Sequence, residues 1–104
     1  GSKYTRMESY MRVNGKKRIK EFMKSHVDSS SALRSLTAIA EAAHWHTSMD
    51  IMREFASASF LSRNRVVFNI GGNKFRLVVI AVYVQETLIV TWIGTHAEYA
   101  KLNL

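Results

Sequence analysis

The chain has no cysteine, no proline and no long apolar run, and each absence excludes a class of protein. Without cysteine it can form neither a disulfide framework nor a thiolate metal site, which fits a reducing cytoplasm. No apolar stretch approaches the roughly 20 residues that cross a bilayer, and the basic N-terminus lacks the apolar segment of a signal peptide. We therefore expect a soluble, cytoplasmic protein with no membrane partner. Because proline is absent, helix boundaries must be inferred from caps and glycines.

Acidic residues are scarce as well. Eight Asp and Glu stand against fifteen Lys and Arg, which gives a net charge of +7 and favours polyanions as partners, although part of this excess could be a solvated face. At 104 residues and 47% apolar composition, the chain is long enough for one globular domain. We assign residues 11–104 to that domain and interpret residues 1–10 as an expression scar and leader, with Met7 or Met11 as the native start.

Helical spacing of apolar residues dominates the first half of the chain after a short extended stretch at residues 11–13. Ile19, Phe22, Met23 and Val27 predict a basic amphipathic helix whose apolar stripe we interpret as a core face. Asp28 and the serines after it supply N-cap chemistry for a second helix, whose apolar positions are Leu33, Leu36, Thr37, Ala40 and Ala43. A capping-box pattern at residues 47–50 predicts a third helix with Met52 and Phe55 on one side.

From Arg65 the apolar period changes to two and β-branched residues dominate, so a sheet is predicted. Gly71 and Gly72 tolerate positive φ and would reverse the chain in a hairpin. After this turn, alternation sends residues 75, 77, 79, 81 and 83 to one face and residues 74, 76, 78, 80 and 82 to the other. A two-residue turn at residues 85–86 would pair Arg76 with Thr95. The predicted fold is α+β, with N-terminal helices packed on an antiparallel sheet of three to four strands and a short C-terminal helix.

Residues 95–98 match a capping box and predict that terminal helix. His96 and Tyr99 would then lie at i and i+3 on one side of it, where a histidine can transfer protons near neutral pH. Free N–H groups at the helix start attract phosphate, and Arg76 across the strand could hold a phosphate bidentately. Lys74 shares its face, and Arg65 could reach the same cluster across the turn. The alternative is that His96 is only a cap and Tyr99 only packs.

Two segments carry a resemblance to a known family: NRVVFNIGGNKFRLVV at residues 64–79 and GTHAEY at residues 94–99. With weaker echoes at residues 11–13, 45, 50–51 and 56–60, they resemble HigB-type toxins of bacterial type II toxin–antitoxin systems, which belong to the RelE-like messenger-RNA interferases. The resemblance runs from about Met11 to the C-terminus. It departs from the family pattern at Ala100, where an acidic residue is frequent, and in the leader.

The resemblance implies a RelE-like fold and a metal-independent endoribonuclease without cofactors, acting in the bacterial cytoplasm. Its substrate would be mRNA in the A site of the 30S ribosomal subunit, cut by attack of a 2′-OH on the adjacent phosphate so that translation stops. Its partner would be a HigA-type helix-turn-helix antitoxin. On matching positions, Arg76 would stabilise the phosphate, His96 would act as general acid or base, and Tyr99 would assist. The residues implied in RNA binding are Arg65, Asn73, Lys74 and Lys101.

Other interpretations of single features are weaker or remain open. His44 and His46 invite a metal site, but histidines at i and i+2 on a helix point apart and no third ligand is evident. Trp45 is predicted to anchor the core, and alternation groups Trp92 with Leu88 and Val90, which favours the core over base stacking. Two functions besides the ribonuclease remain possible: a noncatalytic RNA- or ribosome-binding module, and a protein that only binds a helix-turn-helix partner.

Overall fold

The computed structural model describes residues 10–104, so the leader predicted for residues 1–10 lies, apart from Tyr10, outside the described part. The fold is α+β, as predicted. The helices are α1 (Lys16–Ser25), α2 (Ser30–Glu41), α3 (Ser48–Glu54) and α4 (His96–Ala100), with 3₁₀ turns η2 (Val27–Ser29) and η3 (Tyr83–Gln85). The strands are β1 (Arg12–Asn14), β2 (Ser59–Leu61), β3 (Arg65–Ile70), β4 (Phe75–Val82) and β5 (Thr87–Thr95). No helix among residues 10–104 has the length and apolar character to cross a membrane.

One sheet organises the molecule, in the strand order β1-β5-β4-β3-β2. The sheet therefore has five strands instead of the predicted three to four, and it is mixed, because β1 pairs with β5 in parallel while the other pairs are antiparallel. The two additional strands are the edge strands. Each is three residues long, which is too short for an alternating pattern to stand out in the sequence.

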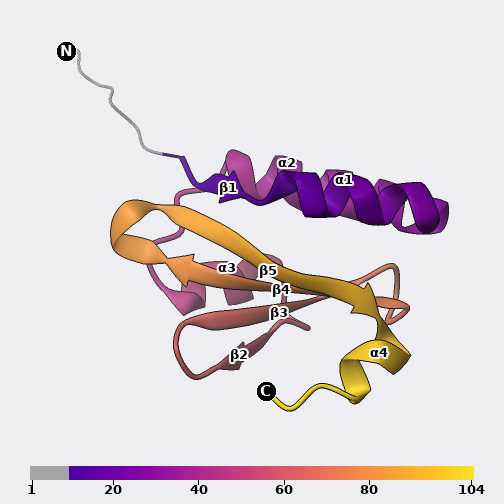
Figure 1. Ribbon diagram of the computed structural model, residues 1–104. Coiled ribbons are helices and arrows are strands. Elements are labelled where there is room, and N and C mark those ends of the chain that lie inside the picture. Colours follow the sequence, from indigo (N-terminus) through magenta and orange to yellow (C-terminus); the bar gives the residue numbers. More distant parts are fainter. Residues whose placement is uncertain (1–9) are drawn as a thin grey trace.

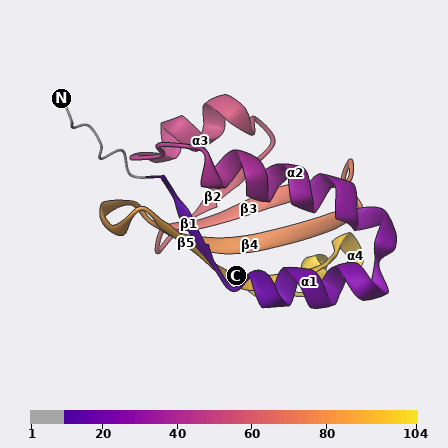
Figure 2. The same cartoon turned by 90° about the horizontal axis from the view of Figure 1, so that it is seen from above.

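The helices α1 and α2 lie on one face of the sheet, and α4 lies on the other (Figure 1). Seen from above, α2 crosses the middle of the sheet while α1 runs beside β5 (Figure 2). Apolar residues at helical spacing bury themselves against alternate residues of the central strands; the core includes Ile19, Leu33, Leu36, Ala40, Val66, Phe68, Leu77 and Val79. Most of the predicted stripe is confirmed, but Val27 is 74% exposed because the chain leaves the helix and forms η2 there.

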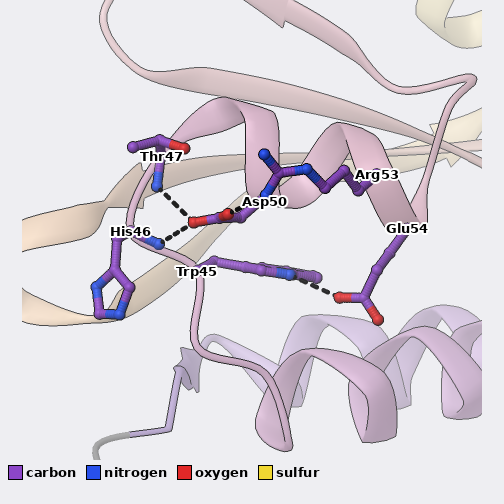
Figure 3. A network of polar contacts seen from close by, with 6 residues as sticks. All are labelled: Trp45, His46, Thr47, Asp50, Arg53 and Glu54. Atoms are coloured by element: carbon purple, nitrogen blue, oxygen red, sulfur yellow. Dashed lines mark hydrogen bonds and ion pairs between the residues drawn. The ribbon is translucent and has the colours of Figure 1, made fainter.

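The loop and helix after α2 close one end of the core around Trp45 (Figure 3). Trp45 is 2% exposed, as predicted for a core anchor, and its indole Nε1 donates a hydrogen bond of 2.7 Å to Oε1 of Glu54. The capping box of α3 is confirmed between Thr47 and Asp50. The hydrogen bond that Asp50 accepts from the backbone N–H of His46 lowers the pKa of this carboxyl below its usual value. The buried side chain of this helix is Ile51, and Met52 is 42% exposed.

The β3–β4 hairpin is confirmed, with Ile70 opposite Phe75. Gly71, Gly72 and Asn73 all have positive φ, of 61°, 59° and 84°, so the turn uses the conformation for which the two glycines were expected. The faces of β4 are also as predicted: Phe75, Leu77, Val79 and Ala81 join the core. Arg76 is consequently on the face away from α1 and α2.

Candidate active site

The β3–β4 turn, the end of β5 and the helix α4 meet at one end of the sheet. There Phe75 pairs with Thr95 and Arg76 pairs with Gly94, so the predicted pairing of Arg76 with Thr95 is wrong by one residue. Two irregularities cause the shift. The chain connects β4 to β5 through η3 and pairs Val82 with Thr87, and a bulge then adds one residue to β5 between Val90 and Trp92.

Arg76 is a buried charge, with 7% of its surface exposed. Its Nη1 donates to the backbone oxygens of Asn73 and Phe75, each at 3.1 Å, and its Nη2 donates to Oδ1 of Asn73 at 3.4 Å. Among the described residues, the Nε–H and one Nη2–H have no hydrogen-bond acceptor. The turn therefore fixes the guanidinium from one side and leaves donors for an anion. Asn73, which the resemblance assigns to RNA binding, lies in this structure as the residue that holds Arg76.

One aromatic ring lies beside the guanidinium, and a second ring contacts the first. The ring centroid of Tyr99 is 5.8 Å from Cζ of Arg76, within the range of a cation–π contact. Tyr99 also contacts Trp92, with 6.1 Å between ring centroids and a tilt of 54°. The expectation that Trp92 joins Leu88 and Val90 in the core is wrong, because the bulge at Thr91 reverses the alternation after Val90. Trp92 is only half-buried and lies next to the residues predicted to form the site.

The predicted capping box at the start of α4 is confirmed. The backbone N–H of Thr95 donates to Oε1 of Glu98 at 2.8 Å, and that of Glu98 donates to Oγ1 of Thr95 at 3.1 Å. The bond from the Thr95 N–H lowers the pKa of the Glu98 carboxyl, assisted by the hydroxyl of Thr95 and by the charges of His26 and Lys101. The backbone N–H of His96 donates to the oxygen of Lys74 at 2.8 Å. The backbone N–H groups of His96 and Glu98, which were expected to be free for phosphate, are thus already hydrogen-bonded. The side chain of His96 is exposed.

The four residues assigned to RNA binding are not all together. Lys74 follows the turn and is exposed, with Nζ 3.4 Å from Oδ2 of Asp28. Lys101 caps the end of α4 and is exposed. Arg65 does not reach Arg76. It pairs with Ile80, whereas Arg76 pairs with Asn69, four residues further along β3 and hence about 14 Å away along the strand. Its Nε donates to the backbone oxygen of Ser62 at 2.9 Å.

His26, which follows α1, lies against the first residue of β4 and was not among the predicted site residues. Its ring stacks on Phe22, with centroids 4.0 Å apart and planes 10° apart, and meets Phe75 edge-on at 5.6 Å. Nδ1 lies 3.3 Å from the backbone oxygen of Phe22. A hydrogen bond there would fix the imidazole tautomer and direct Nε2 away from the helix. No sequence signal marks this residue, because it lies between two helices and outside any periodic pattern.

A comparison with protein families identifies the chain. A family model described as HigB toxin, the RelE-like toxic component of a toxin–antitoxin system, matches residues 29–102, which is more than half of the chain. The chain belongs to the HigB toxin family. As a HigB toxin it is the toxic component of a toxin–antitoxin system and has an antitoxin as its partner. No curated protein sequence matches it.

The family match includes Arg76, Trp92, His96 and Tyr99, whereas His26 lies before the matched residues. The α+β architecture of this HigB toxin, with its short terminal helix, agrees with a RelE-like fold. Within residues 10–104, no group of three or more His, Asp or Glu side chains is arranged to hold a metal ion.

Proposed function

We propose that this HigB toxin is an endoribonuclease that cleaves mRNA in the ribosomal A site and stops translation. The observation that carries the proposal is the guanidinium of Arg76, which the turn holds with two donors left and which lies beside Tyr99 on the helix that begins at His96. A cation held in this way suits a phosphate whose negative charge increases during reaction. The RelE-like character of the family supports the choice of RNA as substrate.

In the proposed reaction the ribose 2′-OH attacks the adjacent phosphorus. The 2′ oxygen forms a bond to phosphorus as its proton leaves, the bond to the 5′ oxygen breaks, and that oxygen takes up a proton. The products are a 2′,3′-cyclic phosphate and a 5′-OH end. His96 transfers a proton as general acid or base, and its exposed position lets it reach a bound strand. Tyr99 supports Arg76 and can donate a hydrogen bond to the phosphate. The reaction requires no metal or cofactor.

The basic residues around the cluster then bind the RNA backbone. Lys74 lies in the turn that holds Arg76, and Lys101 is the C-cap of the helix that carries Tyr99, so we assign the phosphates near the cleaved bond to these two residues. Arg65 lies at the far end of β3 and would contact the ribosome or a more distant part of the strand. The antitoxin partner in this proposal is a HigA-type helix-turn-helix protein.

The test is expression without antitoxin, followed by growth measurement. We expect His96→Ala and Arg76→Ala each to relieve growth arrest, while His46→Ala, which changes an exposed histidine before α3, stays toxic. Circular dichroism of each variant confirms that it folds, which matters for the buried Arg76. Undiminished toxicity of both site variants would refute the assignment. Stalled translation without new mRNA ends in the wild type would instead indicate a noncatalytic RNA-binding module.

A further inference from the structure

An open groove lies beside the candidate active site, between α1 and the outer half of β5. Its volume is about 910 Å³, and the residues that define its character are Lys17, Arg18, Glu21, Phe22, Trp92 and Ile93. The groove exists because β1 is short. It pairs with β5 only as far as Ile89, and the chain then turns away at Gly15, whose φ is +94° and where an added Cβ would lie 3.0 Å from Cβ of Val90.

The charge of the groove favours an anion. Lys17 and Arg18 line it and are exposed, and neither has an ion-pair partner among the described residues. The one acidic residue that lines it, Glu21, is already paired with Lys24 at 3.6 Å. Two cations are therefore available to a polyanion along this side of α1.

The groove also contains a partly exposed aromatic surface that is continuous with the site. Trp92 lines the groove, and its ring contacts Tyr99, which in turn lies against Arg76. A partly exposed indole that lines a groove is the kind of surface on which a nucleobase stacks. The groove thus combines cations with an indole, the two features that sites for single-stranded nucleic acid commonly share.

We propose that this groove binds the single-stranded RNA segment next to the cleaved phosphate, with one base stacked on Trp92 and the following phosphates on Lys17 and Arg18. The inference rests on the proposed function and extends it, because it places the substrate strand between α1 and β5. It also gives a role to the basic face of α1, which lies outside the residues matched by the family model.

The two tryptophans of the protein provide the measurement. Trp45 is 2% exposed, so a base that stacks on Trp92 quenches the emission of Trp92 alone. The probe is a six-nucleotide single-stranded RNA with 2′-O-methyl groups, which cannot be cleaved by 2′-OH attack. We expect saturable quenching in the wild-type toxin, no quenching in Trp92→Leu, and binding by Trp92→Leu that is about 5- to 150-fold weaker by fluorescence anisotropy.

The role of the two cations is tested with Lys17→Ala/Arg18→Ala. This double variant should weaken binding and reduce the slope of log affinity against log salt by about 0.7 for each phosphate that is no longer neutralised. The matched control is Lys20→Ala/Arg34→Ala, which removes two cations from the groove between α1 and α2 instead. Both double variants change exposed residues, so folding should be unaffected.

The RNA-binding results and the mRNA-cleavage results test the groove and the catalytic function separately. Equal RNA binding by the two double variants, or unchanged Trp92 emission at saturating RNA, would overturn the groove as an RNA site even if the toxin cleaves mRNA. Loss of antitoxin binding with unchanged RNA binding would assign the groove to a protein partner and also overturn the proposal. Quenching and weakened binding without any mRNA cleavage would support the groove and refute the catalytic function separately.

Discussion

Gly94 lies opposite Arg76 in the sheet, and the structure leaves no room there for a side chain. A Cβ at this position would lie 2.5 Å from Cη2 and 2.7 Å from Cζ2 of Trp92, and 2.8 Å from Oε1 of Glu98. Carbon atoms in contact are normally about 3.5–4.0 Å apart, so Gly94→Ala must move the indole by about 1 Å. The Glu98 carboxylate must move as well, which disturbs the cap of α4.

We expect Gly94→Ala to cost about 1–3 kcal/mol of unfolding free energy, the usual cost of overpacking. Urea denaturation measures it directly, and the melting temperature should fall by roughly 4–8 °C for each kcal/mol of destabilisation. Because Trp92 and α4 both shift, mRNA cleavage should fall further than the loss of folded protein explains.

A double-mutant cycle tests whether the clash with Trp92 causes this loss of stability. In a Trp92→Leu background the ring that blocks the new methyl group is gone, so Gly94→Ala should cost less by about 0.5–3 kcal/mol. The control is Gly72→Ala, which meets no atom within 4 Å but has a φ of +59°. Its backbone strain of roughly 1–2 kcal/mol should be the same in both backgrounds. If Gly94→Ala costs nothing, or costs the same with and without Trp92, the indole does not pack over Gly94 in the way that the structure shows.

Three further predictions concern other parts of the molecule. Glu98 has a lowered pKa in the folded protein, so its contribution to stability is present above its unfolded pKa and disappears as pH falls through the folded pKa. Glu98→Gln should therefore lower the melting temperature at pH 7. An equal difference in melting temperature at acidic pH would contradict this. Lys74→Ala should change stability by less than about 1 kcal/mol, because its pair with Asp28 is exposed, yet reduce the salt slope of RNA binding by about 0.7. Trp45→Phe should cost about 1–3 kcal/mol in urea denaturation, and Glu54→Gln, which retains an acceptor for the indole N–H, should cost much less.

The elements with a strong local pattern could be predicted from the sequence. Alternation across Gly71 and Gly72 predicts the hairpin, and the box at Thr95 and Glu98 predicts α4, because both depend on neighbouring residues. The placement of Arg76 on the face away from the helices follows from the same alternation. Arg76, Tyr99 and the helix that begins at His96 could thus be predicted to lie near one another.

The features that the sequence did not reveal depend on contacts between distant segments. The bulge at Thr91 has no signal in the order of residues, yet it turns Trp92 out of the core and sets Arg76 opposite Gly94. The edge strands β1 and β2 form only because longer strands are available to pair with them. The loop containing His26 reaches the end of the sheet through contacts between distant residues, such as the packing of Phe22 on Phe75, whose ring centroids are 5.5 Å apart.

The central claim is that the cluster around Arg76 and His96 cleaves mRNA on the ribosome. The most direct measurement is to map mRNA 5′ ends across the transcriptome after brief expression of the wild-type toxin without antitoxin, with His96→Ala as the comparison. We predict new 5′-OH ends in phase with the reading frame, present for the wild type and lost for His96→Ala. Ends that ignore the frame would indicate a ribonuclease that acts without the ribosome, and arrested growth without any new ends would contradict the claim.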